Sequence, residues 1–273
     1  MTYNELRKQT NQGWNTWYSC SMTAHVLLPY GFCIGLGFKD FGVSSLIRNL
    51  KVGNYGLKPG SRSWDGSYTC LTFHIGGCDV TVESTAQNGE QYILVTPSGK
   101  SIRDPVLVIE AALLWGKPGT LFHRGRTIGG TFEDGKTIEI RTTGRESSFV
   151  YPDALCPYIA VTLNEPVVVS TAPASVDEVR AMLDRELDKA VAEEAAYGEN
   201  AGAYQAMRSC LAWDTIYEPE HDRICSPVSR AWSESSGGYV LFDWDTYFAA
   251  LMSQFSGPEL AYLNAFAITN EAT

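Results

Sequence analysis

Residues 67–84 read SYTCLTFHIGGCDVTVES, and this stretch decides the fold of the first half of the chain. Apolar and polar side chains alternate on both sides of a central Gly76-Gly77 pair, which is the pattern of strands with one buried face. A two-residue glycine connection is typical of the tight turn in a β-hairpin. The stretch therefore predicts two antiparallel strands.

Short strand-like segments lie on both sides of this hairpin, separated by Gly and Pro. They comprise residues 31–38, 91–96, 106–115, 120–126, 136–142, 158–163 and 167–171. No pattern of helical length interrupts them, which disfavours a doubly wound α/β fold. Residues 64–67, WDGS, have the chemistry of a turn that leads into a strand. The spacing predicts an antiparallel β-sandwich over residues 1–172.

The hydrophobic period becomes helical near residue 172. Ser175 is followed three residues later by Glu178, which is a capping-box pattern at the start of a helix. Val and Leu then recur at helical spacing as far as Tyr197. We expect this helix, within residues 173–198, to link two domains and to pack its apolar stripe against the sandwich.

Three more helices are expected in a second domain of residues 199–273. Their predicted ranges are 201–217, 242–254 and 258–269, the last with Pro258 in its first turn. Strands come first and helices second, so the predicted fold class is α+β.

The composition excludes several classes of function. The chain has 273 residues and a formal net charge of −10, whereas nucleic acids and anionic membranes need clustered Lys and Arg. The start of the chain is polar and no apolar stretch could span a bilayer, so we expect a cytoplasmic protein. The seven Cys and four His show no metal-ligand spacing, and we expect no metal and no cofactor.

Residues 212–248 carry the densest functional signal, AWDTIYEPEHDRICSPVSRAWSESSGGYVLFDWDTYF. Aromatic rings and carboxylates alternate in this segment. Rings stack on the apolar face of a sugar and carboxylates accept hydrogen bonds from its hydroxyls, so the pattern favours a carbohydrate ligand. The alternative is a pair of amphipathic helices whose aromatic side chains form core.

The run SPVSRAW…GGYVLFDWDTYFAALM, within residues 226–252, resembles the start of the catalytic domain in the mannosylglycerate hydrolase-like group, close to glycoside hydrolase family 63. Four other stretches also resemble that group, namely WNTW (14–17), PGSRSWDGSYTCLTF (59–73), VLVIEAALLWGKPGT (106–120) and AMRSCLAWDTIYEPEHDR (206–223). The resemblance implies a β-sandwich followed by the first helices of an incomplete (α/α)6 barrel. It also implies hydrolysis of a glycosidic bond with inversion.

The resemblance gives Asp245 a role in recognising the sugar at the cleavage subsite, with Trp244 before it as a subsite wall or as core. The residues themselves suggest three further substrate-binding candidates. Trp232 lies in a loop, Tyr247 follows Asp245 on the same helix, and Arg230 carries a cationic fork.

Arg230 has two interpretations. Its guanidinium either holds a sugar hydroxyl or a substrate carboxylate, or forms a structural ion pair with Asp243 or Glu234.

Inverting hydrolysis needs a general acid and a general base about 6.5–9.5 Å apart. The resemblance places both downstream of the Trp-Asp segment, so we assign no catalytic residue. We expect the N-terminal portion of a glycoside hydrolase, inactive alone. Alternatives are a stand-alone carbohydrate-binding or scaffold protein and a truncated product with no role of its own. Barrel helices without neighbours would favour self-association through exposed apolar side chains, namely Leu251, Met252, Tyr262, Leu263 and Phe266.

Overall fold

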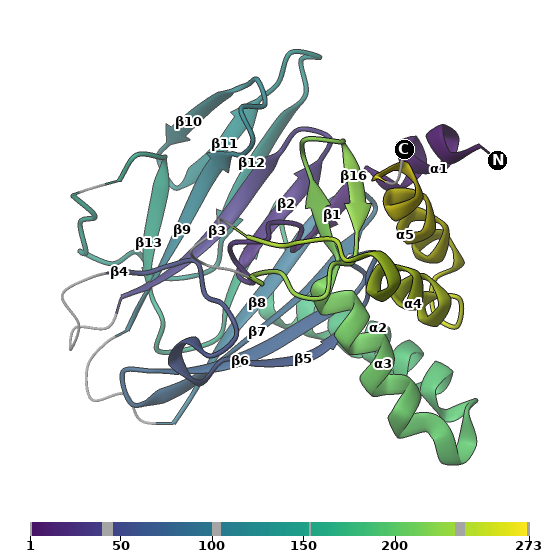
Figure 1. Cartoon of the computed structure of the whole chain (residues 1–273). Helices are drawn as coiled ribbons and strands as arrows, with labels where there is room; N and C mark the ends of the chain where they lie inside the picture. Colours follow the sequence, from purple (N-terminus) through teal and green to yellow (C-terminus); the bar gives the residue numbers. More distant parts are fainter. Residues whose placement is uncertain (1, 40–45, 100–104, 153, 233–237, 272–273) are drawn as a thin grey trace.

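The computed structural model describes residues 2–39, 46–99, 105–152, 154–232 and 238–271. Two antiparallel β-sheets face each other, and the helices gather at one end of them (Figure 1). In the first sheet the strands run in the order β1 (Gly13–Asn15), β2 (Ala24–Leu28), β3 (Phe32–Lys39), β9 (Val106–Leu113) and β13 (Tyr158–Thr162), and β4 (Leu46–Ile47) pairs with β3. In the second sheet the order is β10 (Thr120–Arg124), β11 (Thr127–Thr131), β12 (Thr137–Thr142), β14 (Val167–Ser170), β8 (Glu90–Ser98), β7 (Cys78–Gln87), β6 (Thr69–Ile75) and β5 (Lys58–Arg62).

The predicted hairpin is confirmed as β6 and β7, which pair from Thr69↔Ser84 to Ile75↔Cys78. The turn residues Gly76 and Gly77 have φ values of 60° and 85°. A side chain disfavours this left-handed conformation, so the glycine pair is required by the turn itself.

The core between the two sheets confirms the β-sandwich. Alternate residues of every long strand point inward, such as Phe32 and Ile34 from the first sheet and Val80 and Val82 from the second. Burial of this apolar surface, at about 25 cal/mol per Å², supplies the main driving force for the fold.

Strands β1, β2, β5 and β11 were not among the sequence-predicted segments. Strand β2 is buried along its whole length, so it lacks the alternation that marks a half-exposed strand. In β11 the sequence TIGGT contains two adjacent glycines, a residue type that is depleted in strands. A Cβ on Gly129 would lie 2.1 Å from the carbonyl oxygen of Ile138, so the approach of β12 explains the glycine there.

The capping box is confirmed at the start of α2 (Val176–Ala195). The Ser175 hydroxyl accepts from the Glu178 amide at 3.3 Å, and the Glu178 carboxylate accepts from the Ser175 amide at 2.8 Å. Val179 and Leu183 then pack on the outer face of the second sheet. The expected apolar stripe ends there, because Leu187 and Val191 are exposed.

The second predicted helix is shorter than expected. Helix α3 (Ala201–Asp214) ends at Asp214, and Thr215 turns into extended backbone. Residues 216–218 form strand β15 (Ile216–Glu218), paired with β16 (Arg223–Cys225), instead of the last helical turn. The cause is tertiary, because the Tyr217 amide donates to the carbonyl oxygen of Trp17 at 3.1 Å.

The two C-terminal helices lie close to their predicted ranges, as α4 (Asp243–Ser253) and α5 (Pro258–Glu271). Leu263 was predicted to be exposed, and that prediction is wrong. It is fully buried with Leu260 against β2 and against α1 (Tyr3–Thr10), which the sequence analysis had left without structure. Leu251, Tyr262 and Phe266 are exposed as expected, whereas Met252 is only half-exposed.

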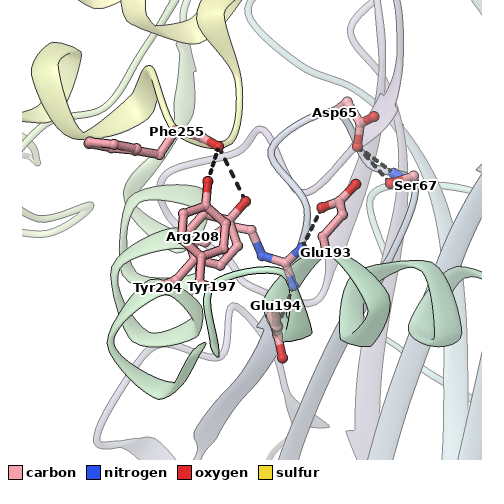
Figure 2. Close-up of polar contacts among 8 residues, drawn as sticks. All are labelled: Asp65, Ser67, Glu193, Glu194, Tyr197, Tyr204, Arg208 and Phe255. Carbon is pink, nitrogen blue, oxygen red and sulfur yellow. Dashed lines mark hydrogen bonds and ion pairs between the residues drawn. The ribbon is translucent and has the colours of Figure 1, made fainter. Parts of the chain in front are cut away.

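A polar contact ties α2, α3 and the α4–α5 turn together, as Figure 2 shows. Arg208 of α3 is buried and donates to Glu193 at 3.2 Å and to Glu194 at 2.7 Å, both on α2. Beside it the rings of Tyr197 and Tyr204 stack at 3.9 Å, and both hydroxyls donate to one carbonyl oxygen on Phe255. This contact sets the position of α3 relative to α4.

We expect Leu183→Asp to release α2 from the second sheet, because it places a charge among buried apolar side chains at a cost of about 3 kcal/mol or more. Limited proteolysis near residue 198 should become faster. The control is Leu187→Asp on the exposed part of the same helix, which should digest like the unsubstituted chain. Unchanged digestion of Leu183→Asp would reject this packing.

Candidate functional site

Helices α3 and α4 lie at the helical end of the molecule (Figure 1). Their side chains border a groove of about 320 Å³. Helix α3 contributes Leu211 and Asp214, α4 contributes Asp245 and Phe248, and the segment after β16 contributes Val228. The remaining lining residues are Met207, Cys210, Ser226, Pro227, Ala249 and Met252. The groove therefore has mostly apolar walls and two carboxyl groups, which is the usual make-up of a small-ligand site.

Asp245 is the sequence-predicted site residue that lines this groove. It is half-buried in the first turn of α4, where the positive end of the helix dipole favours a carboxylate. Phe242 precedes the helix in extended backbone and offers no side-chain cap, so Asp243 and Asp245 are the acidic groups of this helix start. The helix thus presents Asp245 to the groove from a fixed position.

Trp244 and Tyr247 lie on the exposed side of α4, outside the lining of the groove. Trp244 is 72% exposed, and Phe248, one turn further along, is 57% exposed while it also lines the groove. The Tyr247 hydroxyl lies 3.0 Å from the hydroxyl of Thr269 and so links α4 to α5. The interpretation of these aromatic side chains as core is therefore wrong for α4, which carries them at its surface.

Arg230 is buried and turned toward the sandwich. Its three guanidinium nitrogens donate to four main-chain carbonyls, those of Thr16 at 2.7 Å, Thr215 at 2.9 Å, Tyr18 at 3.3 Å and Trp213. This arrangement contradicts the expected ion pair between Arg230 and Asp243. The structure instead uses the cation to satisfy carbonyls that strand and helix bonding leaves open.

Trp232 is 55% exposed and contacts Phe242 edge-on at 5.1 Å between ring centroids. It adjoins residues 233–237, so Glu234, the other ion-pair partner expected for Arg230, lies outside the described residues. Trp232 and Trp244 are thus exposed indoles close in sequence to the start of α4.

Asp214 is a groove residue that the sequence patterns did not predict. It is the last residue of α3, is half-buried and lines the groove with Asp245. Burial raises its pKa to about 6, although the positive charges of Arg230 and Arg62 act in the opposite direction. The sequence signal was hidden because the helix was expected to continue past this residue.

Comparison of the chain with known proteins shows only distant structural likenesses. No family model matches the chain, and no curated protein matches it. Among solved structures, it is similar to a polysaccharide lyase, with 9% identity and a TM-score of 0.32 over 63% of this chain and 33% of that chain. It is also similar to a protein from the human microbiome named as a kojibiose phosphorylase, with 11% identity and a TM-score of 0.31 over 90% of this chain and 39% of that chain. This chain thus spans 33% of the first and 39% of the second, and both likenesses are distant.

Within the described ranges, no helix is long and apolar enough to cross a membrane. No group of three or more His, Cys, Asp or Glu side chains in the same ranges could hold a metal ion.

Replacing Arg230 by Lys should lower the free energy of unfolding by about 2–4 kcal/mol. A lysine ammonium cannot reach four carbonyls in the geometry of the guanidinium fork, and buried carbonyls would lose their donors. Urea unfolding followed by tryptophan fluorescence measures the change, with Arg180→Lys on exposed α2 as the matched control. A loss no larger than that of the control would contradict the role given to Arg230.

Asp214→Asn should stabilise the chain at neutral pH by about 2 kcal/mol. Because the folded-state pKa is raised to about 6, the folded chain keeps a proton that the unfolded chain releases between about pH 4 and pH 6. The stabilisation from that proton is complete at low pH and is lost as the pH rises through 6. Unfolding curves across this range should show the advantage of Asn vanishing near pH 4. An advantage that does not change with pH would disprove the assignment, and Asp184→Asn on exposed α2 serves as control.

Proposed function

We propose that the chain binds a carbohydrate in the α3–α4 groove, as the N-terminal portion of a glycoside hydrolase of the family 63-like type. The observation that carries the proposal is the position of Asp245, a carboxylate at a helix start that lines a groove with apolar walls. Asp245 is the Asp of the Trp-Asp pair that resembles the sugar-recognition motif of that group. The same residue also borders the groove.

Each proposed role follows from the chemistry of its side chain. Asp245 accepts hydrogen bonds from two sugar hydroxyls, as a carboxylate does well. Phe248 offers an aromatic surface to the apolar C–H face of the ring. Trp244, Tyr247 and Trp232 extend that aromatic surface outside the groove, where a longer oligosaccharide would pass.

Arg230 enters the proposal as a positioning residue. Its bonds to the carbonyls of Trp213 and Thr215 hold the chain that leaves α3, and Asp214 lies between those two residues. This differs from a direct contact with the sugar, because its nitrogens already donate to main-chain oxygens.

The proposed reaction class is hydrolysis with inversion in a barrel of paired helices that begins with α3, α4 and α5. None of the positions that the resemblance maps onto this chain is its general acid or base. We therefore expect saturable binding without turnover. A carbohydrate-binding protein without catalysis would behave in the same way toward simple sugars, and the two proposals differ in whether further barrel helices complete the site.

The test is a calorimetric titration of the chain with glucose, mannose and their α-linked disaccharides. We expect dissociation constants in the millimolar range, and a loss of about tenfold or more in Asp245→Ala, because the sugar hydroxyls lose a charged acceptor. Asp243→Asn is the matched control, since it removes a carboxylate from the same helix start outside the groove. Absence of binding at high sugar concentration would refute the proposal.

Turnover is measured separately with α-glucosides and mannosylglycerate. Release of free sugar that disappears in Asp245→Ala would show that the chain is active alone and would overturn the expectation of binding without catalysis.

A further inference from the structure

A second pocket lies between the sandwich and the helices. Its volume is about 100 Å³, and Leu211 is the one described residue that lines both this pocket and the α3–α4 groove. The turn between β5 and β6 lines one part of it, while α2, α3 and the turn between α4 and α5 line the rest. The pocket is therefore a separate feature of the molecule, and the proposed function makes no use of it.

The WDGS turn supplies Trp64, Asp65 and Ser67 to this pocket. The remaining residue, Gly66, lies against β1, where a Cβ would be 2.1 Å from the carbonyl oxygen of Trp14. One oxygen of the Asp65 carboxylate accepts hydrogen bonds from the amide and the hydroxyl of Ser67, at 3.0 Å and 2.8 Å (Figure 2). The turn is thus fixed on the sandwich, and the second Asp65 oxygen receives no donor from the described residues.

The indole of Trp64 forms an aromatic wall of the pocket. A Cβ on Gly257 would lie 2.4 Å from the indole nitrogen, so glycine at this place lets the ring lie against the turn between α4 and α5. Trp64 is half-buried and packs against the cluster that contains Leu260, which also lines the pocket. An aromatic ring beside an aliphatic side chain suits the apolar C–H face of a sugar.

Arg208 brings an unpaired donor to the pocket. Its side chain is 8% exposed, and its two terminal nitrogens donate to Glu193 and Glu194 (Figure 2). Its Nε is also buried but has no hydrogen-bond partner among the described residues. A buried donor without a partner costs free energy, and such exceptions are concentrated at functional sites.

The groups that line the pocket define the chemistry of a ligand. A hydroxyl group can both accept a hydrogen bond from Nε of Arg208 and donate one to the carboxylate of Asp65 or Glu193. An anion would instead be repelled by the two carboxylates, and a cation would leave Nε without an acceptor. The volume equals that of about three water molecules, so the pocket admits one edge of a sugar ring.

We propose that this pocket is a second carbohydrate site, which takes the hydroxyl-bearing edge of a neutral sugar. Adjacent hydroxyls of the sugar bind Nε of Arg208 and the open oxygen of Asp65, and the C–H face of the ring lies on Trp64. The pocket and the groove use different polar side chains, so either site can bind a sugar without the other.

The experiment follows the indole N–H signal of Trp64 by NMR in the full, isotope-labelled chain, and Trp64→Phe identifies that signal by its loss. The chain carries Asp245→Ala, so that the groove lacks its carboxylate. We expect glucose to shift the signal with a dissociation constant in the millimolar range. Asp65→Asn keeps an oxygen for Ser67 but removes the charged acceptor, so the affinity should fall about tenfold. Asp184→Asn on the exposed side of α2 should leave the affinity unchanged.

Arg208 is tested by its conservative variant. Arg208→Lys keeps a positive charge beside Glu193 and Glu194 but removes Nε, and the affinity for glucose should again fall about tenfold. If this variant fails to fold, Asp65→Asn decides the question alone.

The outcomes separate this inference from the proposed function. A Trp64 signal that does not shift at high glucose concentration would overturn the inference, and so would an affinity that Asp65→Asn leaves unchanged. Equal affinity for cyclohexanol, which lacks adjacent hydroxyls, or for acetate, which carries a charge, would also overturn it. The proposed function fails instead when Asp245→Ala leaves calorimetric sugar binding unchanged, and that result does not alter the Trp64 shift.

Discussion

Two buried guanidinium groups around the ring of Trp213 hold the helical part of the chain against the sandwich. Arg62 comes from the end of β5 and lies 5.3 Å from the ring centroid, while Arg230 comes from the segment after β16 and lies 5.9 Å from it. The indole nitrogen of Trp213 donates to the carbonyl oxygen of Gly60 at 2.7 Å. Both arginines also donate to the N-terminal segment at the carbonyl of Thr16, so strand β5, helix α3 and that segment meet at this junction.

This junction is costly, because two cations are removed from water side by side. Burial lowers the pKa of both arginines, that of Arg230 to about 10, and their mutual repulsion lowers that of Arg62 further. The main-chain carbonyls that they bind, together with the Trp213 ring, offset the cost. The junction also holds the chain that leaves α3, because Arg230 donates to the carbonyls of Trp213 and Thr215, and Asp214 lies between these two residues at the groove. The position of the candidate site thus depends on a contact made outside it.

Local patterns predicted the parts of the fold that depend on neighbours in sequence. The Gly76-Gly77 hairpin, the Ser175 capping box and the start of α5 at Pro258 all rest on backbone preferences within a few residues, and the structure has each of them. The end of α3 could not be predicted in this way. It is set by the bond between Tyr217 and Trp17, which lie far apart in the sequence.

The same distinction applies to the site. The prediction that Asp245 contacts a ligand fits its place in the groove, and it came from a motif of adjacent residues. Asp214 and Arg230 were misjudged because their roles depend on burial and on distant carbonyls, which no local pattern reports. The sequence likewise could not show that Leu263 meets β2, since helix α5 is apolar around much of its circumference.

The most direct test of this account is a crystal structure of the chain soaked with glucose. The account predicts density for the sugar between α3 and α4, with hydroxyl groups on the Asp245 carboxylate. Density at another place, such as the smaller cavity beside Arg208 and Trp64, with the α3–α4 groove free of sugar, would contradict it.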